Sequence, residues 1–288
     1  MRLGRIGYIN CFPIYGAIDR GIVPVDADLV TGTPSELNGL LAAGELDVSV
    51  ISAVEYARDA ESYVLLPDLA VSCDGPVRSV ALFSNCPAEE LDGKTVLVSA
   101  SSRTSIHLLE LLCKEVWTVA PHFVEARTEA ADLDTLTDLP HEAVLVIGDA
   151  SLLLAAQNVY QYRYDLGDEW KQWTGLPFVF AVWAARRGKG EKGKREREKG
   201  KGNSFETRVR RIHESLIASR SWGLDHLPEL ANMAAAHTGL SVDVCSEYLC
   251  GLDYDLNYGH IEGLTSFFRR LSNRGIVPQG TLRFLSVA

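Results

Sequence analysis

Residues 4–15 read GRIGYINCFPIY, and this stretch sets the organisation that we expect for the rest of the chain. Its β-favouring residues predict a buried strand over residues 3–9. A polar residue, Asn10, follows where that strand should end, and Pro13 prevents a simple continuation. In open α/β sheets, ligands bind beyond the carboxyl ends of the strands. Asn10 is therefore a candidate ligand contact, although a strand-end Asn can equally satisfy local backbone groups.

The length and composition indicate a globular protein with a large core. The chain has 288 residues, 47% of them hydrophobic, a size that favours about two domains. Its formal net charge of −10 argues against nucleic acid as a partner. No apolar run reaches the roughly 18 residues that span a bilayer, and the N-terminus lacks the apolar core of a signal peptide. We expect a cytoplasmic protein without a membrane partner; the sequence leaves its oligomeric state open.

The cysteine and histidine patterns give no sign of a metal site. The six cysteines form no CxxC pair and no zinc spacing with histidine, so we expect reduced thiols, mostly in the core. The seven histidines show no HExxH motif and no clustered ligand spacing. We therefore expect no metal and no cofactor.

One segment departs from the acidic average of the chain. Residues 186–203, RRGKGEKGKREREKGKGN, contain nine Lys/Arg and three Glu, a net charge of 9 − 3 = +6. The segment has no apolar residue and cannot pack into a core. Such a charge run can bind anionic partners, but the acids and glycines among its bases favour a flexible insertion.

Two helix starts in the sequence suit an anionic ligand. At the first, Thr33 is a predicted N-cap, Pro34 takes the first helical position and Glu36 completes a capping box. At the second, a strand over 94–98 runs into the polar stretch 99–105, SASSRTS, before another helix. This stretch lacks the spacing of a nucleotide P-loop and the GxGxxG fingerprint, so a carboxylate fits better than a phosphate.

Further polar residues accompany the other predicted strands. A strand over 47–52 ends in Ser52, and a strand over 77–84 contains Ser79. Asp149 follows a buried strand over 143–147, and it is a candidate both for the site and for the cap of the next helix. Without other information, a serine inside a strand is most often structurally neutral.

The order of the predicted elements is βαβαβ, a break, βαβαβ and a helical tail, which indicates an α/β fold. The strands 77–84 and 178–184 are the predicted crossings, with a loop rich in aromatic residues over 164–177. We expect a first lobe formed by 1–87 and 185–288, and a second lobe inserted as 88–184. A ligand cleft would lie between the lobes and close by a hinge motion.

Six segments together resemble one enzyme family: RIGYINCFPIY, GTPSELNGLLAAGELDVSVISAVEYAR, LLPDLAVSCDGPVRSVALFS, LDGKTVLVSASSRTS, VLVIGDA and YDLGDEWKQWTGLPFVFAVWAARR. In this order they resemble the chorismate dehydratases of the futalosine route to menaquinone (the MqnA family). The resemblance implies a two-lobed fold of the type II periplasmic-binding-protein class. It also implies that the substrate, chorismate, loses water to give 3-[(1-carboxyvinyl)oxy]benzoate. The basic insertion departs from the family, and the C-terminal helices match only by pattern.

The resemblance also implies roles for particular residues. The family's catalytic Asn and Ser fall on Asn10 and Ser79. The resemblance implies that the enolpyruvyl carboxylate of the substrate itself accepts the proton. Asn10 would not be the base, because an amide is no useful base near pH 7. The enzyme then holds a reactive conformer and stabilises developing charge. The substrate-binding candidates are Thr33, Ser52, Ser102, Arg103, Thr104, Ser105 and Asp149.

Two other functions fit parts of the pattern. A sister enzyme of the same pathway, the dihydroxynaphthoate synthase, would show a polar turn of the Pro-Asn-Asp type and a catalytic His. Neither feature is visible in this sequence. A non-catalytic protein that binds a small anion would bind chorismate without converting it. A turnover assay with chorismate distinguishes these functions.

Overall fold

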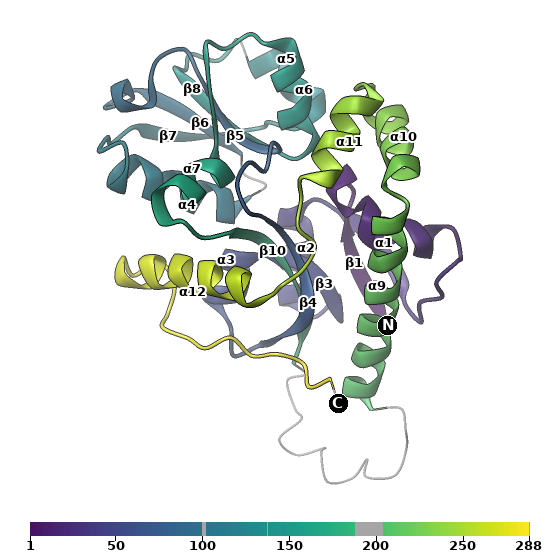
Figure 1. Ribbon diagram of the computed structural model, residues 1–288. Helices are drawn as coiled ribbons and strands as arrows, with labels where there is room; N and C mark the ends of the chain where they lie inside the picture. The colour runs from purple at the N-terminus through teal and green to yellow at the C-terminus, as the bar shows by residue number, and fades with distance from the viewer. Residues whose placement is uncertain (100–101, 137, 188–203, 288) are drawn as a thin grey trace.

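The computed structural model describes residues 1–99, 102–136, 138–187 and 204–287. Within these ranges the strands form two sheets, one in each of two lobes, with helices packed around both (Figure 1). This is the two-lobed α/β fold that the sequence predicts. Of the predicted basic insertion, 186–203, only Arg186 and Arg187 belong to the described residues, and the rest lies outside them.

The sheet of the first lobe has the strand order β2–β1–β3–β10–β4 among the described residues. β1 pairs in parallel with β2 and β3, whereas β10 runs antiparallel to both β3 and β4. The strands are β1 (Arg2–Ile6), β2 (Asp28–Gly32), β3 (Val48–Ser52), β4 (Tyr63–Cys73) and β10 (Phe178–Arg186).

The sheet of the second lobe repeats this plan with the order β7–β6–β8–β5–β9 in the described part of the chain. β6 is parallel to β7 and β8, and β5 is antiparallel to β8 and β9. The strands are β5 (Val80–Ser84), β6 (Thr95–Ser99), β7 (His122–Ala126), β8 (Ala143–Ile147) and β9 (Tyr162–Asp165).

The chain crosses between the lobes twice, once before β5 and once before β10. β5 belongs to the second sheet and β10 to the first, although we expected lobe boundaries at 88 and 184. The crossings are therefore the short segments before these strands, and each expected boundary lies about one strand too late. A buried strand presents the same apolar run in either sheet, so its sequence does not specify its neighbours.

The helices cover the sheets and form the C-terminal tail. They comprise α1 (Phe12–Asp19), α2 (Pro34–Ala43), α3 (Ala53–Arg58), α4 (Arg103–Glu115), α5 (Leu133–Leu136), α6 (Asp149–Gln157), α7 (Leu166–Thr174), α9 (Phe205–Asp225), α10 (Leu227–Thr238), α11 (Val242–Cys250) and α12 (Tyr258–Asn273), with short 3-10 helices η1 (Ile9–Cys11), η2 (Ala88–Glu90) and η3 (Ala130–Asp132). The last four, α9 to α12, form the helical tail that the sequence predicts. None of the helices in the described ranges combines the length and the apolar character that a bilayer-spanning segment requires.

Two local predictions were wrong. The first strand ends at Ile6, not at residue 9, and Asn10 lies in η1, which leads directly into α1. Pro13 lies in the first turn of α1, a position that suits proline. The predicted aromatic loop is mostly the helix α7, whose N-cap is Asp165.

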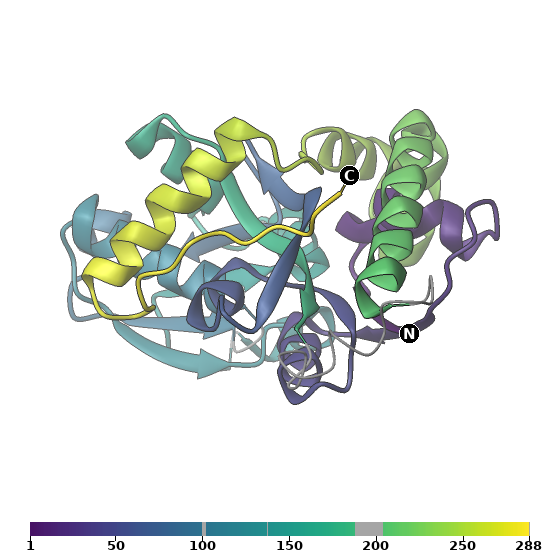
Figure 2. The same cartoon turned by 90° about the horizontal axis from the view of Figure 1, so that it is seen from below.

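The C-terminal tail links the two lobes. α9 packs on α1, α10 contacts α1, and α11 packs on α10 (Figure 1). The segment after α12 runs back along β4, where the amide of Leu65 donates to Arg283 and Leu285 donates to Leu65 (Figure 2). One hydrophobic core extends through both lobes, and a smaller cluster fills the outer side of the second sheet.

Candidate functional site

A narrow cavity of about 60 Å³ lies between the lobes. Its polar lining consists of a tyrosine, an asparagine and four serines, which come from both lobes. These residues are Tyr8, Asn10, Ser52, Ser79, Ser102 and Ser105. The structure thus brings together five of the nine residues that the sequence predicts for the site. Thr33, Arg103, Thr104 and Asp149 lie outside the lining.

Asn10 reaches the cavity from η1, and a residue of the second lobe holds this turn in place. The carboxylate of Asp149 accepts a hydrogen bond of 3.1 Å from the backbone amide of Ile9. The side-chain oxygen of Asn10, Oδ1, is buried and has no hydrogen-bond partner among the described residues. Asp149, the first residue of α6, therefore positions the turn that carries Asn10.

Ser79 lies in the crossing that leads into β5, where several hydrogen bonds fix the backbone. Its carbonyl accepts from the amide of Gly148 at 2.7 Å. The preceding residue, Arg78, has a left-handed backbone with φ of 61°, an unfavourable conformation for a residue other than glycine. The carboxylate of Asp165 accepts the backbone N–H groups of Val77 at 2.9 Å and Arg78 at 2.5 Å, which stabilises this conformation.

Ser52 and Thr33 both cap helices of the first lobe. Ser52 is the N-cap of α3, accepts from the side chain of Asn38 at 3.3 Å and lines the cavity. Thr33 forms the predicted capping box with Glu36, whose carboxylate accepts the amide of Thr33 at 2.8 Å. The Glu36 carboxylate thus already occupies the N-terminus of α2, where we expected an anionic ligand. The neighbouring Pro34 lines the cavity instead.

The predicted anion cradle at the start of α4 divides into two parts. Ser102 is the N-cap, and its hydroxyl lies 2.8 Å from that of Ser105, so both face the cavity as a hydrogen-bonded pair. Thr104 points away and accepts the backbone amide of Val54 at 3.2 Å, which joins α4 to the first lobe. Arg103 is exposed outside the cavity.

The lobes are in contact on the side of Tyr8. Its hydroxyl donates to the carboxylate of Glu129 in the second lobe, with distances of 3.0 and 3.2 Å to the two oxygens. Gly148 has φ of 65°, and a Cβ atom there would come within 2.8 Å of the Tyr8 ring. Glycine therefore permits both the turn and the close approach. A cavity of about 60 Å³ is well below the roughly 300 Å³ of typical small-molecule sites.

Two residues beside the site were missed because their positions depend on tertiary contacts. Asp165 was assigned to a loop, although a polar residue before an amphipathic segment is a signal for an N-cap. Tyr248, on α11, lies next to Asn10 and Ser79 and was treated as part of a helical tail. Its apolar surroundings give a pattern that is indistinguishable from that of a core tyrosine.

Asp149 gives a prediction for the pH dependence of stability. Burial raises the pKa of its carboxyl to about 6, against the opposing effects of the Ile9 amide and of His237, whose Nε2 lies 3.9 Å away. The folded protein therefore binds a proton between about pH 4 and 6 that the unfolded chain does not bind. At about 1.4 kcal/mol per pKa unit, ionised Asp149 costs about 3 kcal/mol at pH 7, and this cost disappears as the pH falls towards 4.

The measurement is urea unfolding of the wild type and of Asp149→Asn between pH 7 and 4. We expect the free energy of unfolding of the wild type, relative to the variant, to rise by about 3 kcal/mol over this range. Asp138→Asn, an exposed change on the same lobe, is the matched control and should show no such trend. A difference between wild type and Asp149→Asn that does not vary with pH contradicts the prediction.

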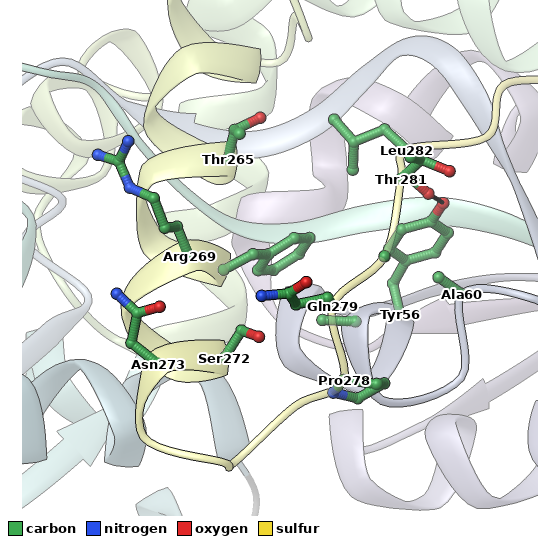
Figure 3. Close-up of a pocket in the computed structure, with 13 residues that line it drawn as sticks. Tyr56, Ala60, Thr265, Arg269, Ser272, Asn273, Pro278, Gln279, Thr281 and Leu282 are labelled. Atoms are coloured by element: carbon green, nitrogen blue, oxygen red, sulfur yellow. Dashed lines mark hydrogen bonds between the residues drawn. The ribbon is translucent and has the colours of Figure 1, made fainter.

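A larger pocket, of about 530 Å³, lies on the outside of the first lobe between α12 and the segment that follows it (Figure 3). Tyr56 and Thr281 lie on one side, and Arg269 extends from α12 on the other (Figure 3). None of its lining residues lines the cavity between the lobes, and none belongs to the predicted site. The polar residues of the predicted site therefore gather in the smaller cavity.

Comparison with known proteins agrees with both the fold and the motifs. The family described as "Menaquinone biosynthesis" matches residues 1–273. The chain is 32% identical over 253 residues to the chorismate dehydratase of Thermus thermophilus, covering 83% of this chain and 84% of that protein.

Two solved structures share the fold at low sequence identity. The protein AF1704 from Archaeoglobus fulgidus superposes with a TM-score of 0.75 at 18% identity, covering 96% of this chain and 98% of that one. The Candida albicans protein CA3427, described as having the generic periplasmic binding protein fold, gives a TM-score of 0.67 at 9% identity. That match covers 100% of this chain and 98% of the other.

The strand orders, the cavity between the lobes and these structural likenesses define a protein with the periplasmic-binding-protein fold of type II. The match over residues 1–273 and the 32% identity to a relative of similar length make the relationship more specific. The chain belongs to the menaquinone biosynthesis family.

Proposed function

We propose that this protein is a chorismate dehydratase of the futalosine route to menaquinone, a hydro-lyase that converts chorismate to 3-[(1-carboxyvinyl)oxy]benzoate and water. The observation that carries the proposal is the 32% identity to a chorismate dehydratase over more than four fifths of both chains. The cavity between the lobes supports it, because it presents neutral hydrogen-bond donors to a substrate that carries two carboxylates.

The chemistry of the reaction suits such a cavity. The ring carbon that bears the enolpyruvyl ether carries a proton acidified by conjugation with the ring carboxylate. When this proton leaves and the neighbouring hydroxyl group departs as water, the ring becomes aromatic, which drives the reaction. The described residues that line the cavity include no His, Lys, Arg, Asp or Glu, which supports the enolpyruvyl carboxylate of the substrate as the proton acceptor.

The protein then contributes orientation and electrostatic stabilisation. We assign Ser102 and Ser105, at the N-terminus of α4, to a substrate carboxylate, because helix N-termini and hydroxyls both stabilise negative charge. We assign Asn10 and Ser79 to the reacting region, where an amide and a hydroxyl can hydrogen-bond the carboxylate base or the departing hydroxyl group. Ser52 lines the same cavity and completes its polar surface.

We further propose that the protein acts in the cytoplasm and has no nucleic-acid or membrane partner. All six cysteines are free, which favours a reducing compartment. The net charge of −10 opposes binding to nucleic acid and to anionic lipid surfaces.

The direct test is to mix the purified protein with chorismate. We expect chorismate to disappear with first-order dependence on protein and an aromatic enol ether to form in equal amount, without added nucleotide. Product is identified by mass spectrometry as a loss of one water. Binding of chorismate without product formation would favour a small-anion binding protein and contradict the enzyme assignment.

A further inference from the structure

Tyr248 on α11 is a buried phenol whose hydroxyl lacks a partner. Its side chain is 1% exposed, and its hydroxyl oxygen has no partner in good hydrogen-bond geometry among the described residues, although the side chains of Ser79 and Asn10 lie near enough to interact with it. A buried polar group without a partner costs free energy, so it usually has a structural or functional reason. Asn10 Oδ1 is buried and unpartnered in the same way, and Asn10 lies next to Tyr248.

An ion pair fixes α11 against the crossing that carries Ser79. Arg78 Nη2 lies 2.7 Å from Glu247 Oε1, so the residues directly before Ser79 and Tyr248 are paired. The phenol of Tyr248 lies next to both Ser79 and Asn10, which line the cavity. Tyr248 itself does not line the cavity between the lobes.

The phenol remains a hydrogen-bond donor at neutral pH. Burial raises the pKa of Tyr248 above its usual range, and its contacts with Ser79 and Asn10 only partly oppose this rise. A neutral phenol has one O–H to donate, and an amide oxygen accepts. The two unpartnered groups are therefore complementary.

We propose that Tyr248 is a positioning residue, whose hydroxyl donates to Asn10 Oδ1 and so directs the amide N–H groups of Asn10 into the cavity. The terminal torsion of an asparagine side chain, χ2, rotates at little cost. Without a restraint, Asn10 would therefore direct either its amide oxygen or its amide nitrogen towards the ligand. A hydrogen bond from the Tyr248 phenol to Oδ1 would hold the Asn10 amide in one orientation. Tyr248 belongs to α11, a helix outside both sheets. The catalytic consequence rests on the proposed dehydratase function.

The test compares Tyr248→Phe with Tyr254→Phe. Tyr254 is also buried, at 2% exposed, and its hydroxyl also lacks a partner among the described residues; its neighbours include Tyr248 but neither Asn10 nor Ser79. We expect Tyr248→Phe to lower kcat about tenfold with KM within about twofold, because one oriented hydrogen bond is lost. Tyr254→Phe should retain wild-type kcat. In an Asn10→Ala background, Tyr248→Phe should have no further effect, because its contribution passes through the amide.

A second readout does not depend on turnover. The side-chain amide resonance of Asn10, assigned by its loss in Asn10→Ala, should shift in Tyr248→Phe and stay in place in Tyr254→Phe. If the wild type does not convert chorismate, the dehydratase function fails while this shift still tests the contact. An unchanged amide resonance, wild-type kcat in Tyr248→Phe, or equal losses in both tyrosine variants would overturn the proposal.

Discussion

Asn10→Ala is expected to lower kcat on chorismate by about 100- to 1,000-fold, and Ser79→Ala is expected to lower it by a comparable factor. Both side chains line the cavity between the lobes, and its described lining offers no acid or base to compensate. Removing one oriented donor from a site that stabilises developing charge typically costs this much. The loss should fall on kcat more than on KM, because the interaction is strongest in the transition state.

Initial rates over a range of chorismate concentrations separate the two parameters. Asn273→Ala is the matched control, since Asn273 is an exposed asparagine that lines the larger outer pocket. Its kcat should equal that of the wild type. If both Asn10→Ala and Ser79→Ala retained wild-type turnover, the roles assigned to these residues would be wrong. A loss in Asn273→Ala alone would instead point to the outer pocket.

Asp165→Asn is expected to reduce both stability and activity. The Asp165 carboxylate accepts four backbone N–H groups: those of Val77 and Arg78 in the crossing, and those of Gly167 and Asp168 at the start of α7. Burial raises its pKa and these N–H groups lower it. An amide in its place would put an NH2 group against backbone donors.

We expect the free energy of unfolding to fall by about 3 kcal/mol in Asp165→Asn, the cost of leaving hydrogen bonds to a buried charge unmade. We also expect kcat/KM to fall about 100-fold, because a displacement of Ser79 by about 1 Å is enough for such a loss. Urea unfolding and steady-state rates measure the two effects.

Asp168→Asn provides the control for Asp165→Asn. It makes the same change three residues later on α7, where, among the described residues, the carboxylate of Asp168 accepts only from the side chain of Gln172. Stability and rate should both stay close to the wild type. If the two variants lost stability and kcat/KM equally, the negative charge at the start of α7 would be the cause, and the hydrogen bonds from Asp165 to the backbone of Val77 and Arg78 would not.

The local chemistry of the sequence was sufficient for many elements. Thr33, Pro34 and Glu36 predicted a capping box that forms as expected, because all of its contacts lie within four residues. The polar stretch 99–105 also precedes a helix as predicted, and in the structure Ser102 of this stretch is the N-cap of α4. Buried strands were also found, since a run of apolar residues bounded by polar ones is itself a local signal.

The first stretch, GRIGYINCFPIY, shows where local reasoning ends. Its strand and its asparagine were found, but the strand stops at Ile6 and a 3-10 turn carries Asn10. The contact that holds this turn comes from Asp149, 140 residues away. No pattern within the stretch encodes that partner.

By itself, the sequence determined the two-lobed α/β class and the capping box of α2, and its family motifs supplied the candidate residues for the site. Only the tertiary structure decided that β5 belongs to the sheet of the second lobe and β10 to that of the first. It also decided that the Glu36 carboxylate occupies the N-terminus of α2. The same is true of Asp165, which binds the backbone before Ser79, and of Tyr248, which lies next to Asn10. The physical reason is the separation along the chain between the residues that interact. Caps and strands depend on neighbours along the chain, whereas sheet order and the orientation of site side chains depend on contacts between distant segments.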